Sequence, residues 1–147
     1  MIQNSESLSE SIEADRALFE SQVDALVAAI YENERPLAGL AGLLDWRFHG
    51  VISACVRSGA ITGKPGECVY VPAVKNGKVF RIILTGAGKS PRPGERSALP
   101  IESLRALQKN LIGLKFSSVG ISSRDFGNPP KEFYSKNLKE IPVRVTL

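Results

Sequence analysis

The chain has 147 residues, of which 43% are hydrophobic and 23% are charged, a length and composition typical of one globular domain. It has no apolar run of about eighteen residues, and Met1–Glu6 lacks the basic start and apolar stretch of a secretion signal, so we expect no membrane partner and a cytoplasmic location. In that reducing compartment, Cys55 and Cys68 are expected to be small core residues rather than a disulfide pair.

The net charge of +4 is unevenly distributed along the chain. Residues up to Glu34 include eight acids and one base, a net charge of −7, whereas those from Arg35 onward include 18 bases and seven acids, a net charge of +11. A basic body attracts polyanions, which leaves nucleic acid open as a partner. The cations after Lys89 are scattered without interleaved aromatic residues, a pattern more typical of a solvated surface.

The N-terminal third begins with a tail and leads to a strand and a helix. Residues 1–10, rich in serine and glutamate, are expected to fray, which leaves 11–147 as a single domain. Ile12–Phe19 fits a strand or a short helix, whereas Val23–Tyr31 fits a buried strand. Apolar residues then recur at spacings of three and four, which predicts one helix that ends at Ser58–Gly59. Its stripe consists of Leu37, Leu40, Leu44, Phe48, Val51 and Cys55.

The middle of the chain, from Gly50 to Lys89, is the most informative run. It contains a proline-glycine turn, a short strand at Cys68–Val71, the hairpin signal Asn76–Gly77 and a strand at Val79–Leu84 that we expect to be buried on both faces. The turn is Gly63, Lys64, Pro65 and Gly66, and the second strand is expected to lead into a glycine loop formed by Gly86, Ala87, Gly88, Lys89 and Ser90.

The C-terminal part predicts further alternation of helix and strand. An irregular segment at Ser90–Pro100 precedes a helix over Ile101–Leu114 and a strand candidate at Phe116–Ser122. Asp125–Pro130 interrupts the chain, and Ile141–Leu147 alternates as a last strand at a sheet edge. The order of elements predicts an α/β domain with a mixed central sheet flanked by helices.

Several of these motifs together resemble the N-terminal domain of the leucyl aminopeptidase (cytosol aminopeptidase) family of metallopeptidases. That domain is related to the macro domain, so the resemblance implies a three-layer, macro-domain-like fold. The resemblance extends more loosely from Val23 to Ile121. The matching residues are Arg35-Pro36-Leu37, Asp45, Gly50, Ile52-Ser53, Arg57-Ser58-Gly59, Thr62 to Gly66, Ile82-Ile83-Leu84 and Gly86 to Lys89.

In that family, the chemistry belongs to a second, C-terminal domain that binds two divalent metals. The present chain stops at Leu147, before such a domain could begin, and the acidic residues after Arg35 include no near neighbours in sequence. Two-metal catalysis needs several carboxylates that converge on a pair of ions. We therefore expect no catalytic residue, no metal site and no cofactor in this chain.

The glycine loop at Gly86–Ser90 invites comparison with a phosphate-binding loop. A P-loop needs a glycine where this chain has Ile83, and a helix that Pro91 and Pro93 disfavour. Two interpretations stay open. One is a macro-type site for ADP-ribose or another nucleotide at the end of a buried strand. The other is a tight turn that lets the strand pass close to its neighbours.

The remaining candidate residues lie on the predicted helix. Trp46 lies off the apolar stripe, and we expect Trp46 and His49 to belong to a contact surface. His49 has no partner at metal-ligand spacing. A triad of Ser53, His49 and Asp45 would share one helix face, but the sequence supplies no glycine elbow or oxyanion loop for it.

Three functions remain open. The favoured hypothesis is a non-catalytic relative of the aminopeptidase N-terminal domain that acts as a protein-association or regulatory module. Family members are hexameric and some bacterial members bind DNA, so the resemblance implies self-association and leaves DNA-binding character open. The alternatives are a macro-type binder of a small ligand, and the N-terminal part of a metallo-aminopeptidase whose two-metal domain lies elsewhere.

Overall fold

The computed structural model describes residues 23–92, 95–116, 118–127 and 143–146 and the single positions 129, 133 and 136. The tail expected at 1–10 and the strand or helix expected at Ile12–Phe19 lie outside the described residues, so both stay predictions. For residues 143–146, the description is limited to the backbone.

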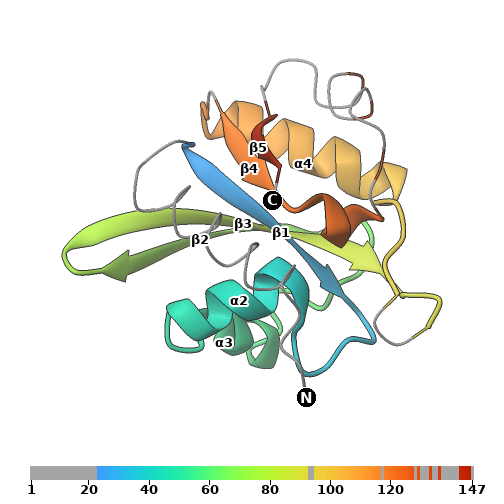
Figure 1. Cartoon of the computed structure of the whole chain (residues 1–147), viewed down its shortest axis with the longest axis horizontal. Helices are drawn as coiled ribbons and strands as arrows, with labels where there is room; N and C mark the ends of the chain where they lie inside the picture. Colours follow the sequence, from blue (N-terminus) through green and yellow to red (C-terminus); the bar gives the residue numbers. More distant parts are fainter. Residues whose placement is uncertain are drawn as a thin grey trace.

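A mixed sheet forms the middle of the molecule, with strands in the order β2-β3-β1-β4-β5 (Figure 1). The central strand β1 (Ala25–Tyr31) pairs in parallel with β3 (Lys78–Gly88) and with β4 (Val119–Ile121). The two edges are β2 (Cys68–Lys75), antiparallel to β3, and β5 (Val143–Thr146), parallel to β4. This arrangement confirms the mixed sheet and the edge position predicted for the last strand.

Helices cover both faces of the sheet and give the three layers expected from the sequence. Helices α2 (Gly39–Arg47) and α3 (Val51–Arg57) lie on one face, and α4 (Ile101–Gly113) lies on the other with the short 3₁₀ helix η1 (Ser123–Phe126) (Figure 1). Successive residues of a strand point to opposite faces, so β1 supplies both hydrophobic clusters. Leu26, Ala28 and Ile30 face α2 and α3, while Ala25, Val27, Ala29 and Tyr31 face α4.

Most local predictions are confirmed. All seven residues of β1 are buried, and Ile82–Leu84 are buried on both faces of β3. Asn76 and Gly77 have φ angles of 53° and 75° and join β2 to β3 as a two-residue hairpin, the geometry that this dipeptide favours. In α4, the buried apolar residues are Leu104, Leu107 and Leu111.

The prediction of one helix through Leu37 and Cys55 is wrong. The chain forms two helices, because the backbone enters the left-handed region at His49 (φ 56°) and Gly50 (φ 83°). The apolar spacing of three and four continues across this break, so periodicity does not reveal it. After the break, the fully buried residue of α3 is Ile52, while Cys55 is half-buried.

The prediction of a loop at Gly86–Gly88 is also wrong. Strand β3 continues to Gly88, and Gly86 and Gly88 are the register partners of Ile30 and Tyr31 in β1. Both cysteines are free thiols, and each is half-buried against a hydrophobic cluster rather than fully inside the core. Within the described part of the chain, no helix is long and apolar enough to cross a membrane.

Candidate functional site

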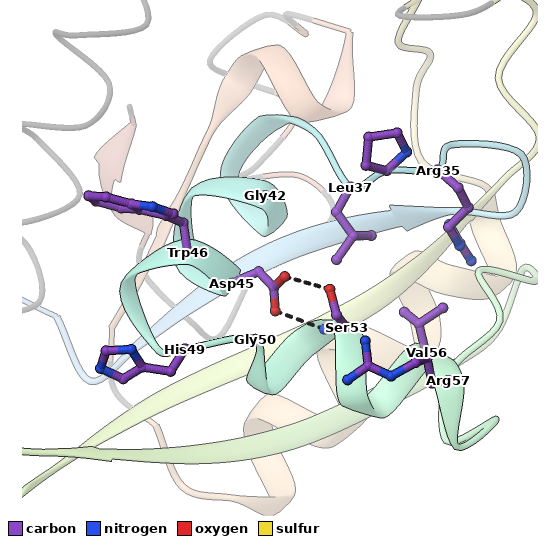
Figure 2. Close-up of a pocket in the computed structure, with 11 residues that line it drawn as sticks. Arg35, Leu37, Gly42, Asp45, Trp46, His49, Gly50, Ser53, Val56 and Arg57 are labelled. Atoms are coloured by element: carbon purple, nitrogen blue, oxygen red, sulfur yellow. Dashed lines mark hydrogen bonds between the residues drawn. The ribbon is translucent and has the colours of Figure 1, made fainter.

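A pocket of about 660 Å³ opens over α2 and α3 (Figure 2). Arg35 and Arg57 border one end of the pocket, and Trp46 and His49 border the other. The complete lining is Arg35, Pro36, Leu37, Gly42, Asp45, Trp46, His49, Gly50, Ser53, Val56 and Arg57. The two residues predicted as a contact surface are therefore brought together with apolar and cationic neighbours, and we call these lining residues the Trp46 surface.

Trp46 is the most exposed large apolar side chain of the described residues. Its exposed fraction is 73%, because Leu40 and Leu44 turn the other side of α2 toward the sheet. The guanidinium carbon of Arg47 lies 5.0 Å from the centre of the indole ring, a cation-π contact. The structure places Trp46 on the surface, as its position off the apolar stripe suggested. Its use as a contact residue stays a prediction.

Asp45 and Ser53 form a structural pair within the pocket. The backbone N–H of Ser53 donates to Oδ1 of Asp45 at 2.8 Å, and the Ser53 hydroxyl donates to Oδ2 at 2.5 Å. Gly50 precedes α3 and has no side chain to cap it, so the Asp45 carboxylate satisfies an amide of the first turn instead. The His49 ring points away from this pair (Figure 2). The geometry therefore joins two helices and does not form a serine-histidine-aspartate relay.

The two arginines of the Trp46 surface have different roles. Nη1 of Arg35 donates to the carbonyl oxygens of Tyr31 and Glu34, each at 2.7 Å, and Nη2 donates to that of Thr62 at 3.3 Å. Arg57 ends α3, and its side chain is exposed beside the pocket. Sequence reasoning did not assign either arginine to a site. Both occur in the motifs that carry the family resemblance, but only the fold brings them to one pocket.

The turn at Gly63–Gly66 packs against the end of β3. The Gly86 N–H donates to the Glu67 carbonyl at 2.9 Å, and the Gly88 N–H donates to the Gly63 carbonyl at 2.8 Å. A Cβ atom at Gly86 would lie 1.9 Å from the Lys64 carbonyl oxygen. Glycine is required at Gly86 because another backbone occupies the space of a side chain.

Three further polar groups of the Gly86–Ser90 segment also bond within the chain. The Gly86 carbonyl accepts from the Ser103 hydroxyl at 2.5 Å, and the Gly88 carbonyl accepts from the Glu32 N–H at 2.9 Å. The Ser90 N–H donates to Oδ1 of Asn33 at 2.9 Å. The amides of Gly86, Gly88 and Ser90 are thus all used internally, which favours the close-packing interpretation. The ligand interpretation stays a prediction.

A largely buried charged cluster lies at the carboxyl end of β1. Nη2 of Arg96 pairs with Oε1 of Glu34 at 2.8 Å, and Nη1 lies 3.7 Å from Oδ1 of Asp125. The same guanidinium stacks 4.9 Å from the centre of the Tyr31 ring. The Tyr31 hydroxyl donates to the Asp125 carbonyl at 2.9 Å, and burial raises the pKa of Tyr31 above its usual value.

Side chains of this cluster occupy the end of the sheet at which open α/β folds usually bind ligands. Even a methyl group at Gly39 would lie 2.3 Å from Oδ1 of Asp125. Sequence reasoning missed the cluster, because Glu34, Arg96 and Asp125 lie far apart in the chain and no local motif links them.

In the part of the chain that the structure describes, no three His, Cys, Asp or Glu side chains gather in a way that could hold a metal ion. The carboxylates of Glu34 and Asp125 face the guanidinium group of Arg96. A cationic side chain therefore occupies the position that a metal ion between these carboxylates would need. The described donors therefore do not fit the pair of divalent metals that the resemblance assigns to a second domain.

Comparison with known families connects this geometry to the motifs in the sequence. A model of the N-terminal domain of the cytosol aminopeptidase family matches residues 26–125. The chain belongs to the cytosol aminopeptidase family. The matched region is the family's N-terminal domain, and it contains both the Trp46 surface and the charged cluster.

Curated members of the cytosol aminopeptidase family match over their N-terminal regions. A probable cytosol aminopeptidase of Trichormus variabilis is 31% identical over 121 residues, which cover 80% of this chain and 23% of the relative. The cytosol aminopeptidase of Pseudomonas aeruginosa is 30% identical over 111 residues, which cover 76% of this chain and 22% of the relative. The chain thus spans less than a quarter of the length of these relatives.

Solved structures with a similar fold are macrodomains. The macrodomain of Thermus aquaticus DarG superposes with a TM-score of 0.63 at 18% identity, covering 88% of this chain and 93% of that one. Thermosipho africanus DarTG, solved in complex with ADP-ribose, gives a TM-score of 0.57 at 15% identity. The match covers 88% of this chain and 39% of that one. These similarities confirm the macro-domain-like fold.

Proposed function

We propose that this aminopeptidase N-terminal domain is a protein-association module and that copies of it associate through the Trp46 surface. The observation that carries the proposal is the 73% exposure of Trp46 beside a pocket of about 660 Å³. The proposal includes a cytoplasmic location. The DNA-binding character left open by the basic charge stays a prediction.

The composition of the Trp46 surface supports association. Tryptophan and arginine are the residue types most enriched among those that dominate binding energy at protein interfaces. Here the indole borders one end of the pocket, and two arginines border the other together with the apolar side chains of Leu37 and Val56. The pocket thus offers apolar area to bury and guanidinium groups to orient a partner.

The described residues offer less support for catalysis. Ser53 and Asp45 are bonded to each other at a helix junction, and the His49 ring points away from them. The aminopeptidase activity named for the longer relatives remains a proposal for any protein in which this domain is joined to a two-metal domain. In such a protein, this domain would contribute a surface through which the copies associate.

The single tryptophan of the chain makes the proposal testable by fluorescence. If copies associate through Trp46, the emission maximum should shift to shorter wavelength as protein concentration rises, because the indole leaves water. Sedimentation velocity over the same range should show a matching increase in mass. Trp46→Ser should remain monomeric, whereas Ile101→Ser, at an exposed position on α4, should associate like the wild type. A monomeric wild type at all concentrations would contradict self-association.

A further inference from the structure

The hairpin formed by β2 and β3 carries an exposed apolar patch. Val71, Ala73, Phe80 and Ile82 of the hairpin face α2 and α3, so the alternating residues Tyr70, Val74 and Val79 face the other side. Their exposed fractions are 38%, 69% and 46%. Val74 and Val79 are direct cross-strand partners, so these two side chains form one apolar surface, and the pair of Pro72 and Arg81 separates them from Tyr70. We call Tyr70, Val74 and Val79 the hairpin patch.

Single exposed apolar residues are normal, whereas contiguous ones are typical of surfaces that contact another protein segment, a ligand or a membrane. A ring contact between Tyr70 and Phe116, with centroids 6.1 Å apart, lies at one end of the patch. Val74 and Val79 lie next to the hairpin turn at Asn76–Gly77, and they are the most exposed of the three.

The start of the described chain lies beside this patch. A cavity of about 120 Å³ is lined by residues 23–25 together with residues 78–81, which include Val79. The pairing of β1 with β3 begins only at Leu26 and Ile82, so β3 extends past the start of β1. The 22 residues that precede Val23 are therefore tethered next to Val79.

The charge of those 22 residues is complementary to that of the hairpin. Residues 1–22 include five acids and one base, a net charge of −4, and their large apolar residues include Ile12, Leu18 and Phe19. Arg81 of the hairpin is exposed on the same side as Val79, whereas Lys75 and Lys78, the direct partners next to the turn, alternate onto the opposite face with Ala73 and Phe80. Covalent attachment through a short linker raises the effective concentration of a segment to about the millimolar range.

We propose that residues 1–22 of this chain fold back over the hairpin patch, with their apolar residues on Val74 and Val79 and their carboxylates near Arg81. A second copy of the hairpin is a poorer occupant, because a symmetric contact over Val79 would bring Arg81 of both copies together. This proposal concerns a different face from the Trp46 surface and does not depend on it.

Arg16 gives a direct measurement, because it is the first trypsin site and the next one is Arg47, since Pro36 blocks cleavage after Arg35. Proteolysis of a segment that opens and closes rapidly follows the population of the open form. Cleavage after Arg16 in the full chain, followed by mass spectrometry, should be slow relative to cleavage of a synthetic peptide of residues 1–22. Combining Val74→Asp with Val79→Asp should accelerate it by at least about tenfold.

Two further variants guard against misfolding and non-specific effects. Arg81→Glu changes one exposed side chain and should also accelerate cleavage after Arg16, because it places a like charge beside the acidic segment. Ile101→Asp alters an exposed apolar residue of α4 and should leave the rate unchanged. Cleavage of the wild type as fast as the free peptide would overturn the proposal. So would protection that depends on protein concentration, because a second copy would then cover the patch.

Discussion

Among the described glycines, Gly86 is the one at which an added Cβ atom would lie nearest to another part of the backbone. A Cβ atom there would lie 1.9 Å from the Lys64 carbonyl oxygen, and a backbone carbonyl moves less readily than a side chain. We expect Gly86→Ala to lower the free energy of unfolding by about 3 kcal/mol or more, the upper range for overpacking. Urea unfolding of the two proteins would measure the difference.

Gly113 is a matched control for this substitution. It ends α4, and a Cβ atom at this position would meet nothing within 4 Å. Gly113→Ala should stabilise the domain by roughly 0.4–1 kcal/mol through the unfolded state. If Gly86→Ala were as stable as Gly113→Ala, the turn at Gly63–Gly66 could not lie against β3 as described.

Cys68 provides a pH-dependent prediction at the same scale. Burial raises the pKa of its thiol from 9.0 to about 11. Between these values, the unfolded chain releases the thiol proton and the folded chain keeps it, so the free energy of unfolding should fall as the pH rises from about 9 to about 11. The pKa of Tyr31 is also raised by burial from its ordinary value of 10.0. Tyr31 should therefore add to the fall in the free energy of unfolding above about pH 10.

Urea midpoints at pH 8 to 11, under reducing conditions, would measure this dependence. Cys68→Ala is expected to be less stable at pH 8 but to lose less stability between pH 9 and 11 than the wild type, since one of the two titrating groups is gone. Identical losses in the two proteins would show that the thiol is as accessible when folded as when unfolded.

Between elements, the Arg96 cluster is the contact that should matter most for stability. Arg96 connects the segment before α4 to Glu34 after β1 and to Asp125 in η1. Removing one member of a buried ion cluster leaves the others uncompensated, at a cost of about 3–5 kcal/mol. We expect Arg96→Met to lower the free energy of unfolding by that amount, as measured in urea.

Arg92 provides the comparison within the same segment. Its side chain is 85% exposed and lies 4.0 Å from Glu95, whereas that of Arg96 is 13% exposed. Arg92→Met should change stability by less than about 0.5 kcal/mol. Adding Glu34→Gln to Arg96→Met should cost less than the sum of the two single changes, and full additivity would argue against the ion pair.

The elements that could be predicted from the sequence are those set by local chemistry. The hairpin at Asn76–Gly77, the buried strand β1 and the helix from Ile101 follow from turn residues and periodicity. The break at His49–Gly50 could not be predicted, because the apolar spacing continues across it. The extension of β3 to Gly88 was missed because glycines usually end strands, and here they admit a neighbouring backbone.

The candidate site was predictable only in part. The exposure of Trp46 follows from its phase relative to Leu40 and Leu44 on α2. The role of Asp45 as a cap for α3 depends on a helix break that the sequence does not show. The contribution of Arg35 and Arg57 to one pocket depends on tertiary structure, as does the pairing of Arg96 with residues from two other segments.

For the whole molecule, the fold raises the question of a nucleotide ligand. The amides of Gly86, Gly88 and Ser90 already donate within the chain, so a phosphate would have to displace these bonds. We therefore expect millimolar ADP-ribose to leave the melting temperature unchanged in a thermal-shift assay. A rise that grows with ADP-ribose concentration and disappears in Gly88→Glu would instead support a macro-type ligand site.

The two hydrophobic clusters share strands β1 and β3, since each of these strands contributes alternate side chains to both clusters. Neither face of the sheet can therefore lose its central strands without disrupting the other. Amide hydrogens of β1 and β3 should exchange with solvent only through global unfolding, while α2 and α3 have room to open locally. An association event on the α2–α3 side that tightens the central strands would then slow exchange on the α4 side as well, with no contact there.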